Sequence, residues 1–272
     1  RNRARMQLAR ILVAQKDATQ AQAVVDSVLA EDARNVDALS VRASLHLLSG
    51  DVSSAIEDLL AALNEAPNDG SLHGLLAEAY DRDGSTLLAQ EQYSKALDLS
   101  GNSAQVGLPV ARFFLRNGKP DQALRALELV RSKAPQNREV LGLLAQIKLA
   151  NRDWLGAQQI ADTLRQLGES TDNVAADRIG AAALIGLDRA AEGVSLLQST
   201  IGTGNSQQAV LPDLINAYVR SGKTEAARDY LQTILVDKPD DVQALTLLGY
   251  VYSLEGQGDL VEATLKKAAA GD

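Results

Sequence analysis

Cysteine is absent from this chain, and aromatic residues make up only 3% of it. Without cysteine there can be no disulfide, no thiolate metal site and no cysteine nucleophile. No apolar run approaches the roughly 20 residues that a membrane-spanning helix needs, so we expect no membrane insertion by this segment. A basic excess is also missing, because the formal net charge is −8, and this disfavours nucleic-acid binding. Hydrophobic residues still account for 46% of the chain, mainly alanine, leucine and valine.

Small residues recur along the chain at a spacing of 34. One series consists of Ala9, Ala43, Ala77, Ala111 and Ala145, and a second of Ala21, Ala55, Ala89, Ala123 and Ala157. A period of this length indicates stacked structural units rather than one folded core. Such an array usually offers a binding surface and carries out no chemistry.

The pattern within each unit predicts two helices joined by a turn. With Val36 as position 1, apolar residues fall at positions 4, 7, 8 and 11, which is one face of a helix. Glycine follows at position 15, where a helix is expected to end. A second apolar pattern occupies positions 20, 24 and 27 and ends near position 32, where Pro67, Pro135 and Pro239 stand. The predicted units are residues 2–35, 36–69, 70–103, 104–137, 138–173, 174–207, 208–241 and 242–272.

This pattern resembles the tetratricopeptide repeat family, whose unit is a helix–turn–helix of 34 residues. The best-matched stretches are Leu76-Ala77…Tyr80…Gly84…Ala89…Tyr93…Ala96 and Leu211…Leu214…Tyr218…Gly222…Ala227…Leu231…Pro239. The resemblance covers the whole chain and implies an all-α fold, a right-handed superhelical solenoid of antiparallel helix pairs, as a single array over residues 1–272. Since the sequence begins without methionine and inside a helical pattern, we expect a fragment of a longer protein.

The fifth and sixth units fit the pattern least well. Lys148 and Asp177 stand at positions that are apolar in other units, and Gly193 replaces the alanine of position 20. Two extra residues, Asp172 and Asn173, shift the phase of the repeat. The sequence leaves open whether this marks an irregularity of the solenoid or a harmless surface loop.

Three stretches imitate binding motifs, and the repeat explains each of them better. Residues 217–224 resemble a phosphate-binding loop, but Gly222 is the repeat turn and no strand is expected before it. Residues 81–84 echo a calcium loop that lacks its later ligands. His46 and His73 occupy apolar repeat positions, which favours core packing over a metal site. We therefore predict no nucleotide, metal, cofactor or catalytic residue.

The resemblance implies that the first helix of each unit lines a concave groove through positions 2, 5, 9, 12 and 13. Position 12 is mainly apolar, and positions 9 and 13 carry arginines. The candidate partner-binding residues are Arg82, Arg112, Leu115, Arg116, Asn216 and Arg220. Arginine pairs well with carboxylates, so a protein or peptide segment with acidic and apolar groups would fit. The alternative is that position 12 packs against the neighbouring unit and the arginines are only solvated.

These observations favour a non-catalytic scaffold that binds a protein or peptide partner in its groove. A second hypothesis is a bacterial cell-envelope component that assists polysaccharide export or assembly. Glycan grooves usually present aromatic platforms, and here Tyr250 is the only aromatic residue at positions 9, 12 or 13. This disfavours direct sugar binding but permits a scaffold in such a system. Localisation stays open between the bacterial periplasm or cell envelope and the cytoplasm.

Overall fold

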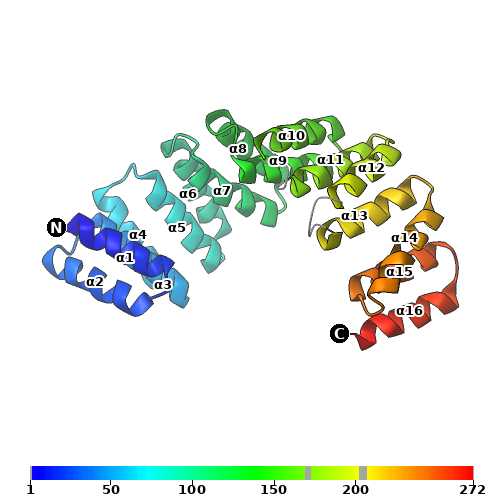
Figure 1. Cartoon of the computed structure of the whole chain (residues 1–272). Coiled ribbons are helices and arrows are strands. Elements are labelled where there is room, and N and C mark those ends of the chain that lie inside the picture. The colour runs from blue at the N-terminus through cyan, green and yellow to red at the C-terminus, as the bar shows by residue number, and fades with distance from the viewer. Residues whose placement is uncertain (1, 169–172, 202–206, 272) are drawn as a thin grey trace. The chain divides into compact units, whose positions relative to one another are not determined.

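The computed structural model describes residues 2–168, 173–201 and 207–271, and within these ranges every regular element is a helix (Figure 1). The sixteen helices in these ranges are α1 (Asn2–Ala14), α2 (Ala18–Glu31), α3 (Val36–Ser49), α4 (Val52–Glu65), α5 (Gly70–Asp83), α6 (Thr86–Leu99), α7 (Ala104–Arg116), α8 (Pro120–Lys133), α9 (Arg138–Ala150), α10 (Trp154–Leu167), α11 (Val174–Gly186), α12 (Ala190–Ile201), α13 (Gln207–Arg220), α14 (Thr224–Asp237), α15 (Val242–Leu254) and α16 (Gly258–Ala270). The prediction of an all-α solenoid is confirmed.

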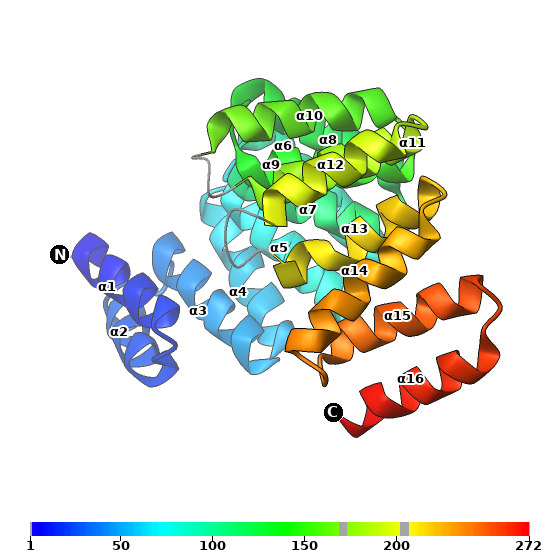
Figure 2. The ribbon, with the colours of Figure 1, turned by 45° about the vertical axis from the view of Figure 1, so that its right-hand side comes forward.

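Each odd-numbered helix forms a hairpin with the even-numbered helix that follows it (Figures 1 and 2). We call these the first and the second helix of a unit. Each of the eight predicted units contains one such pair of helices. The chain divides into two compact parts, Arg1–Val140 and Leu141–Asp272, which we describe separately as the N-terminal and the C-terminal part.

The turn between the two helices has the same backbone conformation in all eight units. Position 15 has a positive φ at Lys16, Gly50, Gly84, Gly118, Arg152, Asp188, Gly222 and Gly256. Glycine adopts this left-handed conformation freely, whereas a residue with a Cβ atom is strained in it by about 1–2 kcal/mol. The sequence predicts the turn where glycine is present, and the structure shows that Lys16, Arg152 and Asp188 form it as well.

The core follows the small residues of the repeat. All ten alanines of the two series at positions 8 and 20 are fully buried. Position 24 adds larger side chains that are also fully buried, such as Val25, Leu59 and Leu127. Because alanine projects only a methyl group, the two helices of a unit approach closely, and neighbouring units supply the remaining contacts.

Charged residues at apolar positions are held by local ion pairs. Lys148 donates a hydrogen bond from Nζ to Asp153 Oδ2 at 2.8 Å. Asp177, which is buried, accepts from Arg165 Nη2 at 2.8 Å and from Thr200 Oγ1 at 2.9 Å. The fifth and sixth units therefore form regular helices, because Lys148 and Asp177 each have an oppositely charged partner nearby. Of the two inserted residues, Asn173 precedes α11, and Asp172 lies outside the described residues.

The stretch that imitates a phosphate-binding loop is an ordinary repeat turn. Tyr218 is buried on α13, Gly222 forms the left-handed turn, and Lys223 precedes the start of α14. His73 packs in the core as expected, with Nδ1 2.7 Å from Gln92 Oε1. Among the described residues, no helix is long and apolar enough to cross a membrane.

Candidate functional site: the first-helix face

The candidate binding surface consists of residues at positions 2, 5, 9, 12 and 13 of the first helices, which we call the first-helix face. In the N-terminal part, α5 and α7 pack side by side and carry four of the six predicted residues. Arg82 lies at the end of α5, and Arg112, Leu115 and Arg116 lie on α7. The three arginines are exposed and Leu115 is half-buried, so these side chains form one accessible strip on two adjacent helices.

Each arginine of this strip is paired with a carboxylate. Arg112 Nη2 donates to Glu139 Oε1 at the start of α9. Arg116 Nη2 donates to Asp81 Oδ2 on α5.

Arg82 has two partners. Its Nη2 donates to Glu78 Oε1 at 2.6 Å, and its Nη1 donates to the carbonyl oxygen of Leu47 at 2.7 Å, so it links α5 to α3. The strip thus balances three guanidinium groups against three carboxylates.

The pairs repeat with the period of the chain. Arg10 pairs with Asp37, and Arg112 with Glu139, both across 27 residues, which joins position 9 of one first helix to position 2 of the next. The repeat positions alone do not predict these acidic partners. Positions 9 and 2 lie about two helical turns apart, and they meet only because neighbouring first helices are staggered along their axes.

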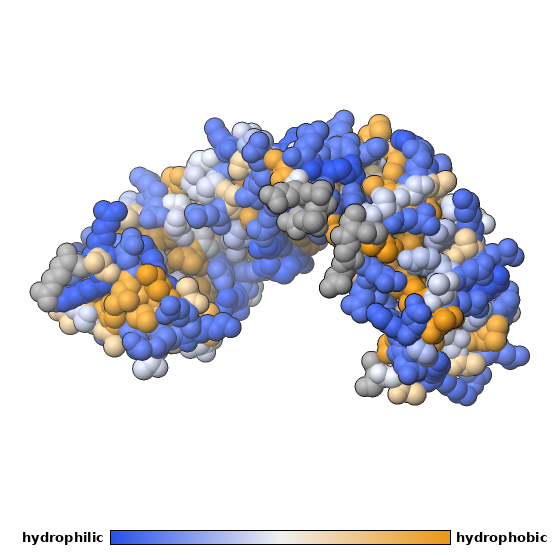
Figure 3. Space-filling model, viewed as in Figure 1, coloured by the Kyte–Doolittle hydropathy of each residue, from blue (hydrophilic) through white to orange (hydrophobic). Residues whose placement is uncertain are grey.

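Position 12 is only partly available to a partner. Leu47 is 4% exposed and packs in the core, as the alternative interpretation of this row predicts. Leu115 keeps part of its surface accessible. Position 13 adds an apolar side chain that the sequence pattern did not single out. This residue is Leu48, whose side chain is 66% exposed. In the view of Figure 3 the surface is mostly hydrophilic, with apolar patches that include one over the N-terminal helices.

The other two predicted residues, Asn216 and Arg220, lie on α13 in the C-terminal part. Both are exposed. Within the described ranges, Arg220 takes part in no ion pair. It therefore differs from the three arginines of the N-terminal strip, and it lines a shallow hollow with Ile185 and Val219.

A cavity of about 350 Å³ opens between α5 and α7, beside the arginine strip. Its lining residues come from three helices: Ser71, Gly74, Leu75, Glu78, Tyr93, Gln105, Val106 and Pro109. Tyr93 belongs to α6, and its ring packs against Phe113 with a centroid distance of 4.9 Å. Burial raises the pKa of Tyr93, so its phenol keeps its proton at neutral pH.

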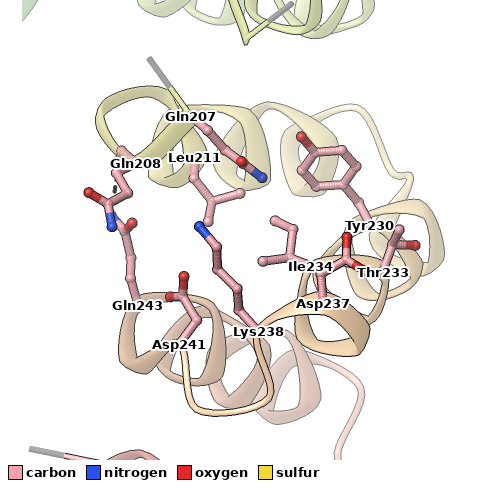
Figure 4. A pocket seen from close by; sticks show the side chains of 10 residues that line it. All are labelled: Gln207, Gln208, Leu211, Tyr230, Thr233, Ile234, Asp237, Lys238, Asp241 and Gln243. Atoms are coloured by element: carbon pink, nitrogen blue, oxygen red, sulfur yellow. Dashed lines mark hydrogen bonds between the residues drawn. The ribbon is translucent and has the colours of Figure 1, made fainter. Parts of the chain in front are cut away.

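The C-terminal part has a smaller cavity of about 220 Å³ between α13, α14 and α15 (Figure 4). The Lys238 side chain extends into it, with Leu211 and Ile234 nearby. Gln243 Nε2 donates to the carbonyl oxygen of Gln208 at 3.0 Å and closes one side. Its mixture of one cation, carboxylates and amides indicates no single class of ligand.

No group of three or more metal-ligating side chains comes together in the part of the chain that the structure describes. The first-helix face offers guanidinium donors, carboxylates and apolar side chains. These groups can bind a partner, and they carry no arrangement of nucleophile and base.

A family model described as tetratricopeptide repeat matches residues 82–147 and 114–176, and a second model with the same description matches residues 6–71 and 213–271. Together these ranges cover most of the chain. No curated protein matches the sequence significantly.

Solved structures share the fold. A tetratricopeptide repeat protein from Parabacteroides merdae aligns with a TM-score of 0.64 at 18% identity, over 86% of this chain and 92% of its own. PilF from Pseudomonas aeruginosa aligns with a TM-score of 0.61 at 16% identity, over 83% of this chain and 96% of its own. The C-terminal part of a tetratricopeptide repeat-containing protein from Cytophaga hutchinsonii aligns with a TM-score of 0.58 at 15% identity, over 98% of this chain and 95% of its own.

Proposed function

Because this chain belongs to the tetratricopeptide repeat family, whose fold generally serves as a protein-interaction scaffold, we propose that its first-helix face binds a segment of a partner protein without catalysis. The observation that carries this proposal is the strip of Arg82, Arg112 and Arg116 on adjacent helices. Three long cations are oriented side by side, with the half-buried Leu115 next to them.

The ion pairs of the strip leave donors free for a partner. A guanidinium group has five N–H donors, and Arg112 and Arg116 each use one nitrogen in their pairs with Glu139 and Asp81. The carboxylates orient the guanidinium groups, and the remaining edges can bind a carboxylate of the partner. Because the strip is locally balanced in charge, the partner segment needs apolar contacts as well as acidic groups.

The test replaces both arginines of α7. Arg112→Ala with Arg116→Ala should weaken partner binding about tenfold, or about 1.4 kcal/mol, with no loss of helicity. The partner is first recovered from the native lysate by pull-down and identified by mass spectrometry. Its affinity for the purified variants is then measured by titration calorimetry at low and high salt, where screening should reduce the difference.

The matched control removes two arginines from the second helix of the same unit. Arg125 and Arg131 on α8 are both exposed, and Arg131 pairs locally with Glu128. Arg125→Ala with Arg131→Ala removes the same charge and should leave affinity unchanged. Equal affinities of both double variants and the wild type would refute the proposal that this face binds the partner.

A further inference from the structure

One of the residues that line the cavity between α5 and α7 is a glycine, Gly74. Gly74 stands at position 5 of α5, in the interior of a helix, where glycine destabilises relative to alanine. A Cβ atom built there would meet only Ala96 Cβ, at 3.9 Å, which is ordinary contact. Alanine would therefore fit without strain, and a glycine keeps the space open at the expense of helix stability.

Most of the cavity wall is apolar, and Ser71, Glu78 and Gln105 add polar groups to it. Leu75 of α5 and Val106 and Pro109 of α7 line it. Burial of an aliphatic group against such side chains is favourable because it removes apolar surface from water. The one charged side chain at the wall, Glu78, is already paired with Arg82.

An unpaired hydrogen-bond donor faces this space. Tyr93 is only 3% exposed and lines the cavity, and within the described part of the chain its hydroxyl has no hydrogen-bond partner. Glu78 of α5 lines the same cavity as Tyr93.

The other buried tyrosines of the core behave differently. The hydroxyl of Tyr218 accepts from Gln198 Nε2 at 2.6 Å, and that of Tyr252 accepts from Gln232 Nε2 at 3.2 Å. The Tyr93 oxygen is not among the fully buried polar atoms that lack a partner, so solvent reaches it, and a ligand in the cavity can replace water as its partner.

α7 contains an acceptor that lacks its usual helical donor. Pro109 sits inside α7 and has no N–H to donate to the carbonyl oxygen of Gln105, four residues earlier. Helical carbonyls point along the axis toward the following turn, and both Gln105 and Pro109 line the cavity. The cavity therefore combines a largely apolar space with the Tyr93 hydroxyl and with Gln105, whose carbonyl lacks the N–H of the residue four positions later.

We propose that this cavity binds one large aliphatic side chain of an extended partner segment, whose backbone pairs with the Tyr93 hydroxyl and the Gln105 carbonyl. A peptide residue offers this combination, because a backbone carbonyl and a backbone N–H flank its side chain. The inference rests on the proposed function and names the feature of the partner that this part of the face recognises. The neighbouring arginines then bind acidic residues that flank the aliphatic one.

Three substitutions separate the elements of the site. Gly74→Leu fills the cavity with a side chain of the chain itself. Tyr93→Phe removes the donor, and since its hydroxyl is unpaired, this change should not lower stability. Pro109→Ala restores the helical N–H for the Gln105 carbonyl and should stabilise α7.

The matched control is Gly142→Leu. Gly142 also stands at position 5 of a first helix, α9, and a Cβ atom there meets nothing within 4 Å. This variant adds the same side chain to the same repeat position away from the cavity. Circular dichroism and urea unfolding of all four variants establish that each one folds.

The probe is a library of random linear peptides displayed on phage and selected on the wild-type protein. Peptides that bind should share one leucine, isoleucine or methionine, and its replacement by alanine should abolish binding. Titration of the synthetic peptides should show about tenfold weaker binding to Gly74→Leu and to Tyr93→Phe, and unchanged binding to Gly142→Leu. Pro109→Ala should weaken binding while raising the urea midpoint.

Selected peptides that bind wild type and Gly74→Leu equally would overturn the cavity proposal. If these peptides bind more weakly to the Arg112→Ala and Arg116→Ala double variant, the proposal that the first-helix face binds a partner still stands. If no selected peptide depends on the cavity residues or on the two arginines, the cavity proposal and the scaffold proposal are both wrong. Peptides that share an acidic or aromatic residue in place of the aliphatic one would also overturn this assignment.

Discussion

Replacing Arg165 by alanine should destabilise the C-terminal part more than replacing its buried partner, Asp177, by leucine. In the wild type, Asp177 Oδ1 accepts from Arg165 Nε and Nη2, and its Oδ2 accepts from Thr200. Removal of one member of a buried ion pair costs about 3–5 kcal/mol, because it leaves a buried charge uncompensated. The Arg165 side chain is 37% exposed and Thr200 still donates in the variant, so we expect about 2 kcal/mol.

Asp177→Leu leaves no buried charge behind. Arg165 keeps its bond to Asp162 Oδ1 at 3.0 Å, and Thr200 keeps its bond to the carbonyl oxygen of Leu196 at 2.9 Å. A leucine fits the pattern of position 4, where Leu39 is buried. The gain in apolar burial offsets the lost hydrogen bonds, and stability should stay within about 1 kcal/mol of the wild type.

The assay is urea unfolding followed by circular dichroism, combined with hydrogen exchange of peptides from α10, α11 and α12. Exchange is needed because repeat arrays do not always unfold in one step. As a control, Arg189→Ala breaks the exposed pair with Glu192 and should leave the free energy of unfolding nearly unchanged. Equal destabilisation by Asp177→Leu and Arg165→Ala would refute this reasoning, because the carboxylate would then stabilise the core in its own right.

Three further predictions concern the turns and the core. Arg152→Gly should raise the free energy of unfolding by about 0.5–1 kcal/mol, because the relief of left-handed backbone strain exceeds the cost of the added entropy of the unfolded chain. Gly50→Ala should lower the free energy of unfolding, and urea unfolding checks the sign of both changes. Ala111→Leu should cost about 1–3 kcal/mol by overpacking, with faster hydrogen exchange confined to neighbouring units; loss of protection along the whole chain would contradict nearest-neighbour coupling. Tyr218→Phe should cost about 1 kcal/mol or less, because it removes one hydrogen bond whose donor, the exposed Gln198, can turn to water; a cost above about 2 kcal/mol would contradict this reasoning.

The helices could be predicted from the sequence because each repeat position sees the same surroundings in every unit. Ala77 and Ala89 are both fully buried, as the two small-residue series require. The period also places the turns, and Gly84 has the left-handed backbone expected of it. Where glycine is absent, as at Arg152, the tertiary packing of the two helices imposes the same turn on a residue with no local preference for it.

The site was only partly predictable. The exposure of Arg112 and Arg116 follows from the repeat position, but their pairing with Glu139 and Asp81 depends on how far neighbouring helices are staggered. The cavity was not foreseen at all. It needs side chains from three helices and the absence of one at Gly74, and no single stretch of sequence contains that combination.

In the N-terminal part, the pairs across 27 residues make the first-helix face respond to dissolved salt differently from the apolar contacts at the alanine positions. Between first helices, Arg10 with Asp37 and Arg112 with Glu139 form exposed electrostatic ties, which dissolved ions weaken. Between the close-packed faces, contacts at alanine positions are apolar and strengthen in salts such as sulfate. A salt such as sodium sulfate therefore weakens the ties between first helices while it strengthens the apolar contacts that hold the units together.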